Sequence, residues 1–168
     1  MSVLAVLLVC HAAIADSPAL PLDRKLALYN QRNGEGVEIE YCQDGVYDPE
    51  ALLVIDRLLR DPFNGDIKAI DPKLLDLLYE LRAKIGATGP FTVLCGYRSP
   101  GTNAAMRRRN PGVAEQSLHM EGKAVDIRLP GVPLAALCKA ARDMKAGGVG
   151  YYPRSGFIHV DVGTVRAW

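Results

Sequence analysis

The sequence has few of the side chains that catalyse reactions near neutral pH. Its 168 residues contain three histidines, four cysteines and one tryptophan. No H-E-x-x-H motif occurs, which excludes a zinc site of the helical zincin type. No two cysteines have the C-x-x-C spacing, which argues against a zinc-thiolate site. The net charge is only +1, so electrostatics give no basis for binding nucleic acid or an anionic membrane.

The length and composition nevertheless suit one globular domain with its own core. Hydrophobic residues make up 49% of the chain, and the chain is too long to need the disulfide framework of a miniature protein. No internal repeat, linker or low-complexity block divides the sequence. We therefore predict a single domain over residues 22–168.

Residues 1–15 are typical of a signal peptide. The stretch from Ser2 to Ala15 is apolar but too short to span a membrane, and an A-x-A pattern precedes Asp16. A basic n-region is missing, and Val9 before Cys10 fits a lipoprotein cleavage site poorly. We predict cleavage after Ala15, export to the periplasm and no stable membrane insertion.

Cleavage there would leave Cys42, Cys95 and Cys138, each in an apolar segment. We expect them to be core cysteines. An oxidising compartment would allow one disulfide among them, and the sequence leaves the pair open.

Hydrophobic periodicity and turn residues predict a mixture of helices and strands. Asn33-Gly34 between two alternating runs predicts a β-hairpin over residues 26–41, at an edge of the sheet. Asp-Pro pairs at 48–49 and 71–72 predict the starts of two helices. Further helices are expected at 103–109 and 134–145, with strands at 91–96, 123–129, 147–152 and 157–163. The fold class is α+β: a small antiparallel-rich sheet that carries the site, with helices packed on one side.

Two of the three histidines lie in a region that also carries aspartates. His119 precedes a short strand across a turn at Gly122, and Asp126 lies in that strand. In the last strand, His159 and Asp161 are two residues apart and point to the same face. Such a set suits a catalytic zinc ion, which takes three N or O ligands and keeps a position for water. The alternative is structural: a turn-capping histidine, an ion-paired aspartate and a hydrogen-bonded strand histidine.

The motifs around these residues resemble those of the LAS zinc peptidases. The segment SLHMEGKAVD at 117–126 is similar to their S-x-H-x-x-G-x-A-x-D signature, and His159 follows in the position of their C-terminal histidine. The chain resembles the YcbK/MepK-like murein endopeptidase branch more closely still. Four segments match that branch in the same order: GYRSPGTNAAMRR (96–108), GVAEQSLHMEGKAVDIRLPGVPL (112–134), GGVGYYPRSGFIHVDVG (147–163) and VRAW (165–168). The resemblance covers nearly all of the chain beyond Leu22 and implies a LAS/hedgehog-type peptidase fold.

The resemblance also implies roles for the residues that match the motifs. His119 and Asp126 would bind zinc, and Arg98, in the GYRS motif, would stabilise the oxyanion of the reaction. Ser117 would lie near the substrate or a ligand. From the residues alone, Arg98 has the alternative of tying its loop to a carboxylate, and Ser117 that of forming a turn.

The last strand departs from the pattern of the group. Many members end in H-x-H, and others carry an acid three residues before the ligand histidine, where this chain has Gly156. Two assignments remain. In the favoured one, His159 is the third zinc ligand and Asp161 is the catalytic base or orients the histidine, because imidazole is the commoner ligand. In the other, Asp161 binds zinc and His159 is the base.

The function implied by the resemblance is zinc-dependent hydrolysis of crosslinks between the peptide stems of bacterial peptidoglycan. Charged stems would suit a cleft that offers Arg98 and the basic run Arg107–Arg109. The alternatives are a D,D- or L,D-carboxypeptidase that trims stem ends, and a non-catalytic murein-binding module. The type of crosslink and the oligomeric state are left open.

Overall fold

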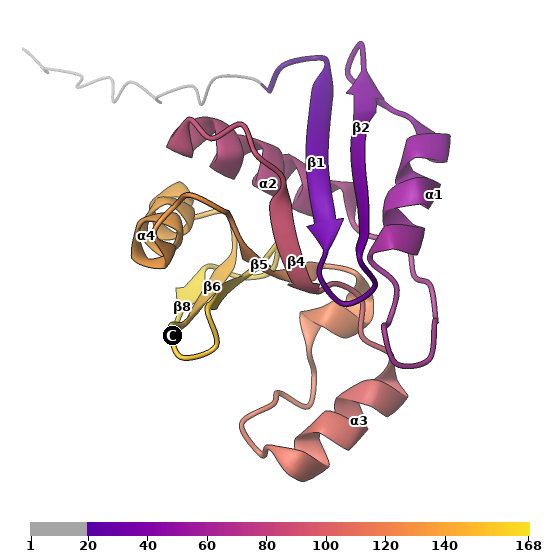
Figure 1. Cartoon of the computed structure of the whole chain (residues 1–168), viewed down its shortest axis with the longest axis vertical. Coiled ribbons are helices and arrows are strands. Elements are labelled where there is room, and N and C mark those ends of the chain that lie inside the picture. The colour runs from indigo at the N-terminus through magenta and orange to yellow at the C-terminus, as the bar shows by residue number, and fades with distance from the viewer. Residues whose placement is uncertain (1–19) are drawn as a thin grey trace, which may run out of the picture.

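The structure, a computed structural model, describes residues 20–168 and is built on one mixed β-sheet (Figure 1). The predicted signal peptide, residues 1–15, lies outside the described residues, as does Cys10. The strands are β1 Arg24–Asn30, β2 Glu35–Gln43, β3 Val46–Tyr47, β4 Phe91–Cys95, β5 Ala124–Arg128, β6 Gly148–Tyr152, β7 Phe157–Asp161 and β8 Arg166–Ala167. The helices are α1 Pro49–Leu58, α2 Pro72–Ile85, α3 Pro100–Arg109, α4 Leu134–Met144 and the short 3-10 helix η1 Leu118–Glu121.

Antiparallel pairs dominate the sheet, as the sequence predicts. The strand order is β3-β2-β1-β4-β5-β7-β6-β8. Only β1 with β4 and β6 with β8 run parallel. The sheet is wider than expected because the two-residue strands β3 and β8 extend its edges. Strands of that length leave too short a pattern in the sequence to be predicted.

Local turn residues and helix N-caps determine where the hairpin turns and where α1 and α2 begin. The predicted hairpin is confirmed: Asn30 pairs with Glu35 across the turn, and Gly34 takes a left-handed conformation with φ of 72°. Asp48 and Asp71 accept hydrogen bonds from the first backbone N–H groups of α1 and α2, and a proline follows each of them.

Helix α3 begins earlier than the predicted residue 103. The side chain of Ser99 accepts a hydrogen bond from the backbone N–H of Thr102, and Pro100 occupies the first helical position. These two residues extend the helix by three positions at its N-terminus. Figure 1 shows α3 apart from the other helices, below the end of β4.

The two faces of the sheet differ because side chains alternate along β5 and β7. Val125, Ile127, Ile158 and Val160 face a continuous core to which α1, α2 and α4 all contribute buried residues. The residues between them point to the opposite face. Asp126, His159 and Asp161 therefore share one face, and helices cover the other, as expected.

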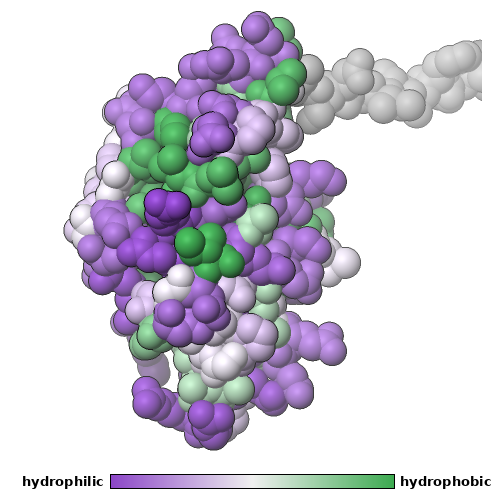
Figure 2. All heavy atoms as spheres, turned by 90° about the vertical axis from the view of Figure 1, so that its right-hand side faces the viewer, coloured by the Kyte–Doolittle hydropathy of each residue, from purple (hydrophilic) through white to green (hydrophobic). Residues whose placement is uncertain are grey.

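None of the helices in residues 20–168 is long and apolar enough to cross a membrane. The side of the molecule that carries α1 and β2 shows hydrophobic residues gathered among hydrophilic ones (Figure 2). The exposed apolar residues of α1, Leu53 and Val54, line a shallow groove against β2.

Gly122 connects η1 to β5 at a place where no side chain fits. Its φ is 71°, and a Cβ there would lie 2.2 Å from the carbonyl oxygen of Ala69. Its own carbonyl accepts a hydrogen bond from the N–H of Asp71, at 2.9 Å. The segment that carries His119 is thus held directly against the start of α2.

We expect Gly122→Ala to cost about 2–4 kcal/mol of unfolding free energy, because it adds a backbone clash to an unfavourable left-handed conformation. Gly131→Ala is the matched control: Gly131 has φ of 80° with open space around the added methyl group, so it should cost about 1 kcal/mol. Urea unfolding of the three proteins measures both values. Equal costs would mean that the close approach to Ala69 is unimportant.

Candidate metal centre and cleft

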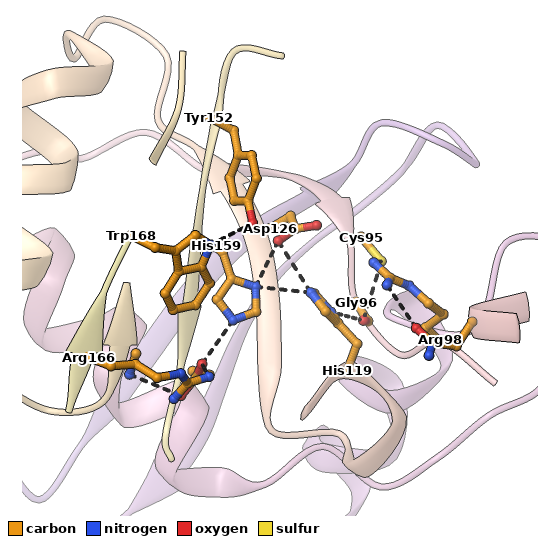
Figure 3. Close-up of polar contacts among 12 residues, drawn as sticks. Cys95, Gly96, Arg98, His119, Asp126, Tyr152, His159, Arg166 and Trp168 are labelled. Atoms are coloured by element: carbon orange, nitrogen blue, oxygen red, sulfur yellow. Dashed lines mark hydrogen bonds and ion pairs between the residues drawn. The ribbon is translucent and has the colours of Figure 1, made fainter. Parts of the chain in front are cut away.

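Three buried side chains from three elements meet on the polar face of the sheet (Figure 3). His119 comes from η1, Asp126 from β5 and His159 from β7, where Asp126 and His159 are paired residues of the antiparallel ladder. The His119 Nε2 atom lies 3.1 Å from His159 Nδ1 and 3.3 Å from Asp126 Oδ1, and His159 Nδ1 lies 3.1 Å from Asp126 Oδ1. We call these three residues the triad.

The outer nitrogens of both imidazoles have acceptors as partners. His119 Nδ1 lies 2.8 Å from the carbonyl oxygen of Gly96, and His159 Nε2 lies 2.9 Å from Asp161 Oδ2. A carbonyl or carboxylate oxygen can only accept, so each outer nitrogen carries the hydrogen. In neutral imidazoles the inner nitrogens are then bare. Two lone pairs and a carboxylate therefore point at one another.

The electrostatics of the triad favour a positive charge in its centre. Burial lowers the pKa of His119, but the neighbouring Asp126 carboxylate and Cys95 together outweigh burial and raise that pKa well above its usual value. Burial likewise tends to raise the pKa of Asp126, yet the two histidines hold it far below its usual value. Asp126 therefore favours a positive charge close to the two imidazoles.

The spacing of the triad also fits a tetrahedral metal ion. Zinc bonds to N and O ligands of about 2.0–2.1 Å give ligand-to-ligand distances of about 3.3–3.4 Å in a tetrahedron. The distances within the triad are 3.1, 3.1 and 3.3 Å. The three N and O donors of the triad match the usual number of protein ligands in a catalytic zinc site.

Asp161 lies beside the outer nitrogen of His159, on the side away from His119 and Asp126. It is fully buried, and its oxygens accept hydrogen bonds from the N–H groups of Gly148 (3.0 Å) and Gly163 (2.9 Å) and from Arg166 Nη2 (2.6 Å). Burial tends to raise the pKa of Asp161, but the bonds from His159 and from these donors lower it well below its usual value. The carboxylate is ionised, and both of its oxygens are engaged.

Arg98 is buried beside the triad, immediately after β4. Its guanidinium donates to Asn103 Oδ1 at 3.1 Å and to Cys95 Sγ at 3.5 Å, and its Nε atom has no partner. Its backbone N–H donates to the carbonyl oxygen of His119 at 3.2 Å. No carboxylate in residues 20–168 forms an ion pair with it, so it does not tie its loop to an acid. A buried cation without a counter-ion stands next to the triad.

Ser117 lies at the start of η1, where its carbonyl oxygen accepts from the N–H of Met120 at 2.9 Å. Its side chain makes no capping hydrogen bond and is half-buried. It is not among the residues that line the cleft described next.

A cleft of about 350 Å³ opens beside the triad. Its walls are mostly apolar, and its charged lining residues are Arg32, Arg98 and Asp126. From α3 it is lined by Thr102 and Met106, whereas the basic run Arg107–Arg109 does not reach it. The expectation that this run contributes to the cleft is therefore wrong. The full lining is Arg32, Pro62, Phe63, Leu94, Cys95, Tyr97, Arg98, Thr102, Met106, Asp126, Ser155 and Phe157.

Cys95 is a site residue that the sequence did not reveal. All three described cysteines are free, and Cys42 and Cys138 are buried as expected, but Cys95 lines the cleft. One donor atom each from Cys95, His119 and Asp126 lie within 4.8 Å of one another. A β-bulge is the cause: Val93 pairs with Ile127 and Cys95 with Asp126, so Leu94 is an extra residue. It turns Cys95 onto the face of Asp126.

The contacts of the C-terminal segment VRAW are a second feature that the sequence did not reveal. The Trp168 ring lies 5.3 Å from the His159 ring, and its Nε1 donates to the hydroxyl of Tyr152 at 2.7 Å. Gly150 makes room for it, because a Cβ there would lie 2.7 Å from the indole. Two residues earlier, Arg166 holds Asp161 in place (Figure 3). A two-residue strand after a loop gave no periodic signal of this arrangement.

The fold, the triad and the cleft beside it define the class of the protein: a metal-dependent peptidase. The sequence matches the family described as "Peptidoglycan L,D-endopeptidase MepK" over residues 19–168, and the chain belongs to that family. The peptidoglycan L,D-endopeptidase MepK of Escherichia coli K12 is 42% identical over 162 residues, which cover 94% of this chain and 89% of the relative. The probable peptidoglycan L,D-endopeptidase MepK of Haemophilus influenzae is 41% identical over 149 residues, covering 88% and 80%. The resemblance inferred from the motifs is confirmed.

Because the chain's one tryptophan lies against His159, its emission should report occupation of the triad. Titrating Zn²⁺ into chelator-treated protein should change tryptophan fluorescence and saturate near one equivalent. His159→Ala is the control and should give no such change. Metal uptake by wild type with unchanged emission would contradict the contact between the two rings.

Proposed function

We propose that the protein is a zinc-dependent peptidoglycan endopeptidase that hydrolyses L,D-type crosslinks between peptide stems. The observation that carries this proposal is the triad, whose bare nitrogens and carboxylate have the spacing of a tetrahedral metal site. Its relatives are named peptidoglycan L,D-endopeptidases, which agrees with the substrate inferred from the motifs and supports an L,D bond, a choice that the sequence alone leaves open.

The proposed zinc ligands are His119 Nε2, Asp126 Oδ1 and His159 Nδ1. When bound there, zinc would polarise the scissile carbonyl and lower the pKa of a water molecule toward about 7. The protein holds these donors in place through their outer contacts: Gly96 accepts from His119, and Asp161 accepts from His159. Such outer partners fix the tautomer and orientation of ligand histidines.

Of the two assignments for the last strand, we propose the one with His159 as ligand. Asp161 then orients His159 and does not act as the base. Its contacts support this role, because both oxygens already accept from His159, Arg166 or backbone N–H groups on the side away from the triad.

Arg98 is the proposed oxyanion contact. Asn103 and Cys95 fix its guanidinium beside the triad, and no carboxylate in the described chain neutralises it. A fixed cation where negative charge develops stabilises the transition state without reorganising. Ser117 remains a prediction as a substrate contact, since its half-buried hydroxyl is not used in capping η1.

We further propose that residues 1–15 are a signal peptide, that residues 22–168 form one peptidase domain, and that the enzyme acts in the periplasm. A substrate in the cell wall requires export, and the apolar segment with its A-x-A pattern provides a signal for it.

The proposal is tested by offering the purified protein three substrates: dimers with an L,D crosslink, dimers with a D,D crosslink, and uncrosslinked pentapeptide stems. We expect the protein to cleave the L,D dimer. A chelator should abolish this activity, and added Zn²⁺ should restore it. If the C-terminal residue of the pentapeptide is released faster than the crosslinked dimers are cleaved, the carboxypeptidase alternative is favoured. Binding of all three without hydrolysis would favour the murein-binding module.

The ligand assignment predicts a graded loss of metal. His119→Ala and His159→Ala should contain no zinc, and Asp161→Asn should bind it about 10–100-fold more weakly, because an orienting partner is disturbed. Cys95→Ser is the control and should keep one zinc per chain. Metal analysis with chelator competition measures all four variants. Full zinc in His159→Ala with none in Asp161→Asn would reverse the assignment.

The oxyanion role predicts that Arg98→Gln keeps its zinc but turns over about 10²–10³-fold more slowly, the usual loss for one oxyanion contact. Arg128→Gln is the matched control, because Arg128 is exposed and donates to Gln31. Zinc content and kcat on the crosslinked dimer are the measurements. Unchanged kcat in Arg98→Gln would leave Arg98 with a structural role.

A further inference from the structure

A second arginine stands at the mouth of the cleft. Arg32 lies in the turn between β1 and β2, far in sequence from the motifs around the triad. Its backbone N–H donates to Asn30 Oδ1 at 3.0 Å, and the buried Asn30 donates in turn to the carbonyl oxygen of Leu58 at 2.7 Å. Gln31 donates to the carbonyl oxygen of Val93 at 3.0 Å. The turn is therefore fixed to the end of the sheet.

The side chain of Arg32 is held as well. Its Nε donates to the carbonyl oxygen of Leu94 at 3.4 Å, and its guanidinium carbon lies 5.5 Å from the centre of the Phe63 ring. Its two terminal nitrogens make no hydrogen bond or ion pair within residues 20–168. The Phe63 ring and the hydrogen bond to Leu94 thus fix the orientation of the Arg32 guanidinium, and its terminal N–H groups remain free to donate. Two such N–H groups match the geometry of a carboxylate.

The cleft between Arg32 and the triad has a distinct chemistry. Its walls are apolar, with Phe63, Leu94, Met106 and Phe157 among them. The buried Arg98 lies at the inner end beside Cys95, and Arg32 is exposed at the outer end. The acid in the lining, Asp126, belongs to the triad. An aliphatic chain that ends in a carboxylate would match both the walls and the outer cation.

We propose that Arg32 is a specificity residue that binds a free carboxylate on an aliphatic side chain of the substrate stem. The aliphatic part would lie on the apolar walls while the scissile bond reaches the triad. This inference rests on the proposed function and adds to it the class of substrate: stems whose side-chain carboxylate is free and not amidated.

The test is a cycle of two enzymes and two substrates. Wild type and Arg32→Gln are assayed on L,D-crosslinked dimers that carry this carboxylate either free or amidated. For wild type, amidation should raise KM roughly tenfold and leave kcat almost unchanged, since the contact is remote from the reacting atoms. Arg32→Gln should show the higher KM on both dimers. Arg57→Gln, an exposed position of α1 outside the cleft, should keep the wild-type preference.

Salt gives a further check, because Arg32 is exposed: the preference of wild type should shrink as ionic strength rises. Arg32→Gln with an undiminished preference for the free carboxylate would overturn the proposal. So would a wild type that treats both dimers alike.

A binding measurement separates this inference from the proposed function. The dissociation constants of the free and amidated dimers are measured with His119→Ala and with the double variant His119→Ala/Arg32→Gln. Tighter binding of the free form that disappears in the double variant supports the role of Arg32 even if wild type hydrolyses neither dimer, an outcome that would defeat the proposed function alone. Equal binding of both dimers by His119→Ala overturns the role of Arg32.

Discussion

The rest of the structure depends on the close approach of three buried hydrogen-bond acceptors, which lie 3.1–3.3 Å apart. They are His119 Nε2, Asp126 Oδ1 and His159 Nδ1. Their lone pairs repel unless a cation lies among them, and burial makes the repulsion strong. The fold imposes the arrangement through two outer contacts, from the carbonyl of Gly96 and from Asp161, which decide where each imidazole carries its hydrogen. A strand ladder sets Asp126 opposite His159, and Gly122 lets η1 bring His119 to them.

Charges elsewhere on the polar face are balanced by close partners. Asp161 has Arg166 and the backbone N–H groups of Gly148 and Gly163 as partners. A Cβ on Gly148 would collide with Asp161 and Arg166, and one on Gly163 would collide with Leu118. Buried charges are normally paired in this way. Arg98 and Arg32 are different, because neither has a carboxylate partner in the described chain. Both line the cleft, so two guanidinium groups without a carboxylate partner lie where a substrate would bind.

Much of the fold could be predicted because its signals are local. The hairpin turn, the Asp-Pro caps and the alternation in β5 and β7 each act within a few residues, and that alternation places His159 and Asp161 on one face. The position of Asp161 behind His159 could not be predicted, since it depends on Gly148, Gly163 and Arg166 closing around it. Cys95 and Trp168 were missed for a related reason: a bulge and a two-residue strand are set by pairing partners distant in sequence.

The bulge in β4 has a consequence for how this enzyme can change. The one extra residue, Leu94, offers its carbonyl oxygen to Arg32, and the same insertion turns Cys95 toward Asp126. Both ends of the cleft are thus adjusted by a single unit of strand length. A deletion there would move Cys95 and the carbonyl contact of Arg32 together, so side-chain exchange around the cleft disturbs this side of the sheet less than a change in the length of β4.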